Sequence, residues 1–332
     1  MLYYNKLLYY NIFMTNRIQT YLLTLIFSVF FLISTANADV KVVTSIKPMH
    51  SLVSYIMDGV GKPDVIVDGY NSPHGFSLKP SHAKMLENAD LVIWIGEDLE
   101  AFLEKPLETI AKKAKNIELM DLKGIKKLEF REKNIFEGHE DHKEHAGHKE
   151  HDDHKEKDGY KGHAHGEHDP HVWLDPINAK IFIKEITKQL IKLDSANSSI
   201  YKSNSKKALA EIDKLIKDIK SNLKKDLRFV VFHDAYQYFE NRFDIQVLGA
   251  LTVNTDVMPG AEQLSEIREV IEHEKVNCLF SEPQFNPAII KSIAKDTNVK
   301  TGILDPLGSE LDKGKNLYFN LLKNMSSSFK GC

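Results

Sequence analysis

The sequence lacks three features that would each point to a class of protein. Its 44 basic and 47 acidic residues give a formal net charge of −3, so there is no basic excess of the kind a nucleic-acid partner requires. No His-Glu-x-x-His motif lies on an apolar helical stretch, which argues against a zinc protease of the common class that carries this motif. The N-terminal apolar run, Tyr21 to Ile33, is shorter than the roughly 20 residues of a comfortable membrane span.

That apolar run is predicted to belong to an export signal. Arg17 precedes it, and the small residues Ser34-Thr35-Ala36-Asn37-Ala38 follow it with an Ala-x-Ala pattern, which is typical of a signal-peptide cleavage site. We expect cleavage between Ala38 and Asp39. No cysteine lies at this site, so we expect no lipid anchor there.

Two alternatives concern this N-terminal region. Tyr3 to Phe13 adds apolar length, so an uncleaved anchor is the alternative to a cleaved signal. Met14 is an alternative start, because Met14-Thr15-Asn16-Arg17 alone makes a compact basic leader to the apolar run.

Cysteine is scarce, and Cys278 and Cys332 are the only two. Export favours joining them, because disulfides persist in oxidising compartments. The bridge would tie the final residue back to a predicted strand. The alternative is two free thiols, with Cys332 exposed at the chain end.

Histidine, by contrast, is abundant, and most of the fifteen lie between residues 139 and 171. The flanking residues are almost all Asp, Glu, Lys and Gly. A segment with so few apolar residues cannot offset its ordering entropy, so disorder is predicted over about residues 137–169. We expect an auxiliary metal-capture run made of His139, His142, His145, His148, His151, His154, His163, His165 and His168.

The remainder of the mature chain alternates between strand and helix patterns. Four apolar, β-branched segments separated by helical periodicity precede the histidine-rich run, and four more follow it, which predicts two parallel sheets. The expected strands are residues 40–46, 63–68, 91–95, 116–120, 228–232, 245–253, 276–281 and 299–304.

A long, lysine-rich helix with a narrow apolar stripe separates the two sets of strands and suits a stiff connector between lobes. The predicted fold is therefore α/β, with two Rossmann-like lobes, each with a parallel four-stranded sheet, joined by this helix. The predicted organisation is a signal peptide (1–38), a leading lobe (39–194), the linking helix (195–225) and a trailing lobe (226–332).

Three histidines and one aspartate follow predicted strands or the histidine-rich run. His74 follows the second strand and His233 a buried strand, His171 lies where order resumes, and Asp305 ends the last strand. In open α/β sheets, ligands bind beyond the carboxyl ends of the strands. A cleft between the lobes would bring all four together.

Three imidazoles suit Zn²⁺, with Asp305 or water in the fourth position. Mn²⁺, which is harder, would favour more carboxylates. His50, His82 and His273 do not follow strands; His82 and His273 are expected to be solvated helix positions, and His50 a helix-start residue near the cleft.

Several blocks resemble a known family. They are His74-Gly-Phe-Ser-Leu-Lys-Pro-Ser81, Ala89-Asp-Leu-Val-Ile-Trp-Ile-Gly96, His171-Val-Trp-Leu-Asp-Pro176, Phe232-His-Asp-Ala-Tyr-Gln-Tyr-Phe239 and Glu282-Pro-Gln-Phe285. In this order they resemble the periplasmic zinc-binding protein of bacterial high-affinity zinc ABC importers, over essentially the whole mature chain. Singly, none of the blocks is specific.

The resemblance implies two α/β lobes with zinc in the cleft, ligand histidines at His74, His171 and His233, and a disulfide between Cys278 and Cys332. It departs at Pro73, where some members carry a glutamate considered a possible ligand. Related manganese and zinc binders use an aspartate near the position of Asp305, so Asp305 and water both remain candidates.

The expected function is capture of Zn²⁺ in the periplasm and its delivery to an inner-membrane ABC permease with its ATPase, by a monomer that carries out no catalysis. Two alternatives are a secreted zinc-dependent hydrolase and a manganese-specific binding protein of the same fold. A hydrolase would turn over a substrate, whereas a transport protein would show only tight stoichiometric binding.

Overall fold

The structure is a computed structural model. It describes Met14 and residues 39–131, 133–136, 167–223, 227–253, 255, 257 and 259–332. The predicted signal peptide, apart from Met14, and the predicted capture histidines, apart from His168, lie outside these residues. Everything below concerns the unit Val40–Cys332.

The leading half folds around a parallel sheet with strand order β2-β1-β3-β4. Every residue of the two central strands, β1 and β3, is buried, as expected where helices cover both faces of a parallel sheet. The elements are β1 (Val42–Ile46), α2 (Lys47–Ile56), β2 (Asp64–Val67), α3 (Pro80–Glu87), β3 (Leu91–Trp94), α4 (Glu97–Thr109) and β4 (Lys115–Glu118).

The trailing half repeats this architecture in a second parallel sheet, with order β6-β5-β7-β8. In each sheet the first strand pairs with the second on one side and the third on the other, which creates a point where the strand order reverses. The elements are β5 (Arg228–His233), α7 (Gln237–Phe243), β6 (Gln246–Thr252), α8 (Ala261–His273), β7 (Cys278–Ser281), α9 (Ala288–Thr297), β8 (Lys300–Ile303) and α10 (Leu317–Gly331).

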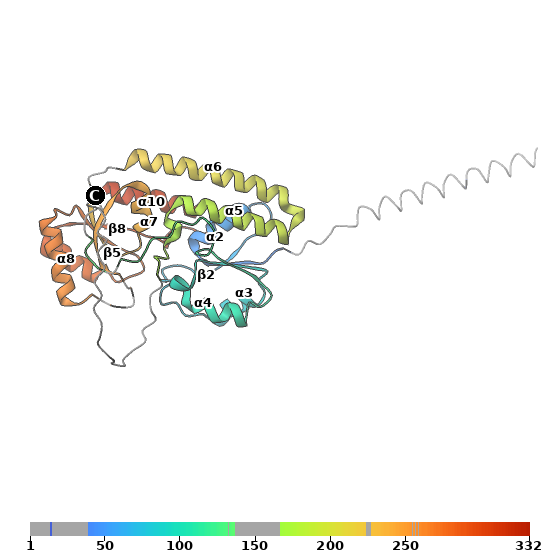
Figure 1. Ribbon diagram of the computed structural model, residues 1–332, viewed down its shortest axis with the longest axis horizontal. Coiled ribbons are helices and arrows are strands. Elements are labelled where there is room, and N and C mark those ends of the chain that lie inside the picture. Colours follow the sequence, from blue (N-terminus) through green and yellow to red (C-terminus); the bar gives the residue numbers. More distant parts are fainter. Residues whose placement is uncertain are drawn as a thin grey trace, which may run out of the picture. The chain divides into compact units, whose positions relative to one another are not determined.

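Two α-helices, each preceded by a short 3-10 turn, join the two sheets. A short 3-10 turn, η1 (Val172–Leu174), leads into α5 (Pro176–Leu193), and a second, η2 (Ser195–Asn197), leads into α6 (Ser198–Asn222). Helix α6 packs on α5, on α2 of the leading half and on α10 of the trailing half (Figure 1). The predicted fold of two parallel four-stranded lobes joined by a long helix is confirmed.

Residue alternation along β5 decides which way its side chains point. Phe229 and Val231 lie in the large core that also contains the leading-half strands, whereas Val230 and Phe232 lie in a smaller core with α8 and α9. Because successive strand residues point to opposite faces, His233 shares the face of Phe229 and Val231. The period of two therefore places its imidazole on the face of the sheet that borders the large core.

The segment after β4 crosses to the trailing lobe. Phe136 N donates to Leu248 O at 2.9 Å, and Ala250 N donates to Asn134 O at 2.8 Å, so residues 133–136 pair with the edge strand β6. Gly249 permits this approach, because a Cβ there would lie 2.7 Å from Asn134 O. The sequence assigns residues 39–194 to the leading lobe, yet residues 133–136 within them hydrogen-bond to the trailing sheet. The predicted domain boundaries stay a prediction.

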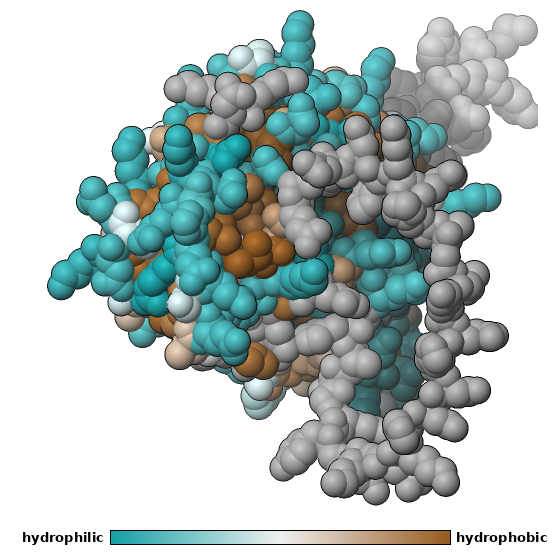
Figure 2. Space-filling model, turned by 60° about the vertical axis from the view of Figure 1, so that its left-hand side comes forward, coloured by the Kyte–Doolittle hydropathy of each residue, from teal (hydrophilic) through white to brown (hydrophobic). Residues whose placement is uncertain are grey.

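A disulfide links Cys278 of β7 to Cys332, with the two Cα atoms 5.8 Å apart. On the face drawn in Figure 2, polar side chains cover most of the described surface, and apolar ones show mainly in a central patch. Within the described residues, no helix combines the length and apolarity needed to cross a bilayer.

Candidate metal centre

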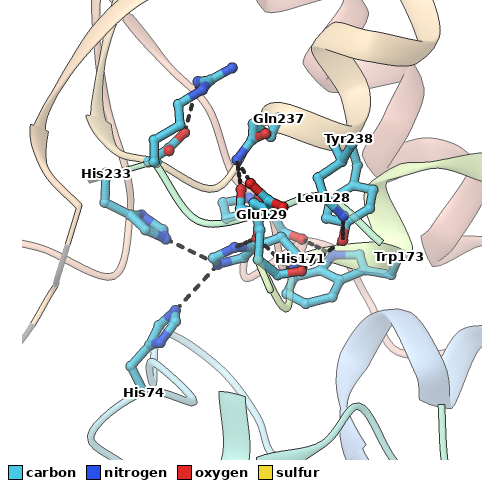
Figure 3. Close-up of polar contacts among 12 residues, drawn as sticks. His74, Leu128, Glu129, His171, Trp173, His233, Gln237 and Tyr238 are labelled. Atoms are coloured by element: carbon cyan, nitrogen blue, oxygen red, sulfur yellow. Dashed lines mark hydrogen bonds and ion pairs between the residues drawn. The ribbon is translucent and has the colours of Figure 1, made fainter. Parts of the chain in front are cut away.

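Three imidazoles from distant parts of the chain meet between the two lobes. His74 Nε2 lies 3.3 Å from His171 Nε2, which lies 3.2 Å from His233 Nε2. Their candidate ligand atoms all lie within 4.8 Å of one another. Figure 3 shows the three rings pointing toward one another from three separate segments. Among the described residues, this is the one group of three or more His, Cys, Asp or Glu side chains able to hold a metal ion.

His74 comes from the loop that follows β2. Its backbone N–H donates to Ser72 Oγ at 3.3 Å, and its side chain is half-buried. The neighbouring Pro73 lines the same cavity as the histidines. The leading lobe thus supplies one imidazole from the carboxyl end of its sheet, as the sequence predicts.

His171 immediately precedes the η1 turn, and that turn is tied to the trailing lobe. Trp173 Nε1 donates to Pro306 O at 2.8 Å, and Tyr318 OH donates to Trp173 O at 2.7 Å. At the start of α5, Asp175 accepts from Ile177 N as an N-cap. Its two oxygens also accept from Arg242 at 2.7 Å each. These contacts fix the turn that presents His171.

The His171 ring is oriented by a carboxylate two residues earlier. Asp169 Oδ1 accepts from the backbone N of His171 at 2.9 Å and lies 2.7 Å from its Nδ1. When Asp169 is ionised, its oxygens only accept, so Nδ1 then carries the proton and Nε2 keeps its lone pair for a metal. Tyr238 OH in turn donates to Asp169 O at 2.8 Å.

His233 has the same arrangement with a partner from a neighbouring strand. Its Nδ1 lies 2.7 Å from Glu282 Oε1, and both side chains are almost fully buried. Glu282 directly follows β7, which pairs with β5. The two residues therefore meet at the strand-order reversal of the trailing sheet. Carboxylates that hold metal-binding imidazoles in this way raise ligand basicity and fix the tautomer.

Sequence reasoning missed both orienting carboxylates. Asp169 could have been found from the Asp-x-His spacing, which allows one carboxylate to reach both the backbone and the ring of His171. Glu282 could have been found because it follows a strand predicted to lie in the same sheet as the strand before His233.

The structure does not bring Asp305 into the histidine group. Its carboxylate accepts from the backbone N–H groups of Leu307, Gly308 and Ser309, and from Gln284 Nε2. Of the four residues expected to converge in the cleft, the three histidines do so and Asp305 does not. The physical reason is that the loop after β8 turns back on Asp305 and uses its oxygens as a cap.

Burial governs the electrostatics beside the site. Burial raises the pKa of Asp169 to about 7 and that of Asp234 to about 8, although the Arg131 guanidinium, 3.0 Å from Asp234, opposes the second shift. Burial and then the His233 charge lower the pKa of His171. Burial would also lower the pKa of His233, but Glu282 and the neighbouring aspartates raise it above its usual value.

The remaining histidines lie elsewhere. The expectation that His82 is solvated is wrong: it is 9% exposed, its Nδ1 accepts from Lys79 N at the start of α3, and its ring lies against Phe76. His273 is exposed on α8, and His50 is buried in α2 beside Ser54. His168 pairs with Glu129 in an isolated antiparallel bridge.

Comparison with known proteins gives a consistent result. The family described as "ZnuA: Zinc-uptake complex component A periplasmic" matches residues 42–332. The high-affinity zinc uptake system protein ZnuA of Brucella abortus (strain 2308) is 46% identical over 312 residues, covering 90% of this chain and 93% of that protein. The protein of the same name from Yersinia pestis is 38% identical over 298 residues, covering 89% and 92%.

The fold is shared with a solved structure. A crystal structure of ZnuA superposes with a TM-score of 0.71 at 24% sequence identity, covering 89% of this chain and 99% of that one. The family match spans both sheets, all three converging histidines and the disulfide. This chain therefore belongs to the ZnuA family of periplasmic zinc-uptake components.

Proposed function

We propose that this chain captures Zn²⁺ in the periplasm and delivers it to an ABC-type permease and its ATPase in the inner membrane. The observation that carries the proposal is the convergence of three imidazoles, one candidate ligand nitrogen from each lying within 4.8 Å of the others, at a place formed by both lobes. Membership of the ZnuA family, and relatives named as zinc uptake proteins, support the transport role.

His74, His171 and His233 are the proposed zinc ligands, with water in the fourth position. Three imidazoles and one oxygen suit the tetrahedral preference of Zn²⁺. Asp169 and Glu282 each contact the Nδ1 side of a ligand ring, so they support imidazoles rather than adding the oxygen ligands that Mn²⁺ favours. The manganese-specific alternative is accordingly not favoured.

The secreted hydrolase alternative is also not favoured. Three histidines and an open position also occur in catalytic zinc sites, but the family to which the chain belongs is a transport component. The proposed protein is a monomer that binds metal stoichiometrically and performs no catalysis. The signal cleavage between Ala38 and Asp39 belongs to the same proposal and lies outside the described residues, apart from Asp39.

The histidine-rich run is proposed as an auxiliary capture segment that raises the local concentration of weakly held zinc. The sequence alone supports this, because all its histidines except His168 lie outside the described residues. Deleting residues 138–167 should keep one tight site, remove weaker ones and slow uptake mainly when zinc is scarce. Complete loss of tight binding would make the run itself the principal site.

Calorimetric titration of the mature chain with Zn²⁺ tests the main proposal, with Mn²⁺ and Co²⁺ as competitors. One tight zinc equivalent that manganese does not displace is expected. Tight manganese binding that excludes zinc, or turnover of ester or peptide substrates by the zinc-loaded chain, would contradict it.

A further inference from the structure

A small cavity adjoins the three histidines. Its volume is about 10 Å³, roughly what one water molecule needs. The histidines, Trp173, Phe285 and Leu307 supply nitrogen and apolar surface, and the polar side chains that complete the lining include Glu282 and Gln284. Glu282 contacts His233 through Oε1, and its Oε2, like Gln284 Oε1, is buried without a hydrogen-bond partner among the described residues.

Gln284 is held in one amide orientation. Its Nε2 donates to Asp305 Oδ1 at 2.9 Å and to Ser309 Oγ at 2.7 Å. An ionised carboxylate offers only acceptors, so the amide nitrogen must face Asp305 and the amide oxygen must point away from it. The contacts of Gln284 Nε2 thus determine where Gln284 Oε1 lies.

The amide oxygen at that other end is buried. Gln284 Oε1 has no hydrogen-bond partner among the described residues, although Gln284 lines the cavity beside the histidines. A buried acceptor without a partner is costly, and native structures normally satisfy it with protein or with ordered water. A water molecule that donates to Gln284 would satisfy it.

We infer that Gln284 positions the water that occupies the fourth ligand position of the bound zinc, by accepting a hydrogen bond from that water through Oε1. Asp305, which the sequence offers as a ligand, acts one step further away by holding the Gln284 amide. The inference rests on the proposed zinc-binding function. It gives the site a neutral acceptor for a neutral fourth ligand.

Zn²⁺ competition titrations and Co²⁺ absorption spectra of the full mature chain test the inference. Gln284→Met keeps a side chain of similar length without the acceptor. It should weaken zinc binding about 10–100-fold, the usual effect of removing an outer hydrogen-bond partner. It should also alter the Co²⁺ spectrum and move the pH at which that spectrum titrates, because the bound water loses its acceptor. Ser309→Ala is the matched control, since Asp305 alone still orients the amide.

Asp305→Asn provides a second, independent variant. The new amide at position 305 can donate as well as accept, so the Gln284 amide is free to exchange the positions of its oxygen and nitrogen. Zinc binding should therefore weaken by no more than it does in Gln284→Met. If Asp305 were itself a ligand, the order would reverse: Asp305→Asn would lose the tight site and Gln284→Met would keep it. Loss of the tight site in Asp305→Asn but not in Gln284→Met would overturn the inference and leave the zinc-capture proposal intact. An unchanged Co²⁺ spectrum and pH titration in Gln284→Met would do the same. Failure of the unmodified chain to bind zinc overturns both.

Discussion

Glu282 Oε1 lies 2.7 Å from His233 Nδ1, and both side chains are almost fully buried. The carboxylate raises the pKa of His233 against the opposing effect of burial and turns Nε2 toward His171. Glu282→Gln keeps an acceptor but removes the charge. We expect the pKa of His233 to fall and zinc affinity to drop about 10–100-fold. Histidine NMR titration of the metal-free chain and a chelator competition measure the two effects; an unchanged His233 pKa would contradict the assigned role.

Replacing a proposed ligand should cost more than replacing its orienting partner. We expect His74→Ala, His171→Ala or His233→Ala to weaken the tight site by more than the roughly 100-fold upper range for outer partners, because each removes a metal–nitrogen bond. His273→Ala is the control, since His273 is exposed on α8. Calorimetry measures the affinities; a tight site that survives all three single replacements would refute the assignment of the centre.

Zinc should stabilise the protein more at pH 8 than at pH 6. Burial lowers the pKa of His233, but Glu282 and the neighbouring aspartates together outweigh this effect and raise the pKa above its usual value. More of the imidazole is therefore protonated at the lower pH, and it must lose that proton before it can ligate. The effect is a larger shift in melting temperature on zinc addition as pH rises. Thermal melts with and without zinc measure it, and a shift independent of pH would contradict the linkage.

The metal-free protein should show the opposite trend. The pKa of Asp169 rises from 3.8 to about 7 on burial, so its folded state binds a proton that the unfolded state releases. That contribution is fully present below pH 3.8 and is lost as pH rises to about 7. Asp169→Asn should flatten this part of the pH–stability curve. Denaturant unfolding of the metal-free chain at several pH values checks it, and an unchanged slope would count against the shift.

The bridge between Cys278 and Cys332 closes a loop with a sequence separation of 54. In the chain-entropy model, such a loop contributes about 4 kcal/mol to the free energy of unfolding. Cys278→Ser with Cys332→Ser should therefore lower that free energy by up to about this amount, with zinc stoichiometry unchanged. Mass spectrometry of the non-reduced mature chain should find no free thiol; two free thiols would show that the bridge does not form.

The sequence by itself determined the fold class and identified the three histidines that meet in the structure. Alternating strand and helix patterns specify parallel sheets, and a ligand site in such sheets must lie beyond the carboxyl ends of the strands. His74 and His233 satisfy that condition from local sequence alone. The period of two along β5 also decides that His233 faces the large core with Phe229 and Val231.

Only the tertiary structure decided which residues support the histidines. Glu282 is 49 residues from His233, and Gln284 and Asp305 are 21 residues apart, so no local pattern reports these contacts. Asp305 met the same strand-end condition as His233, but the loop after β8 turns its carboxylate onto the backbone of residues 307–309. Strand patterns fix where a side chain leaves a sheet, whereas loop closure and side-chain competition fix what it finally contacts.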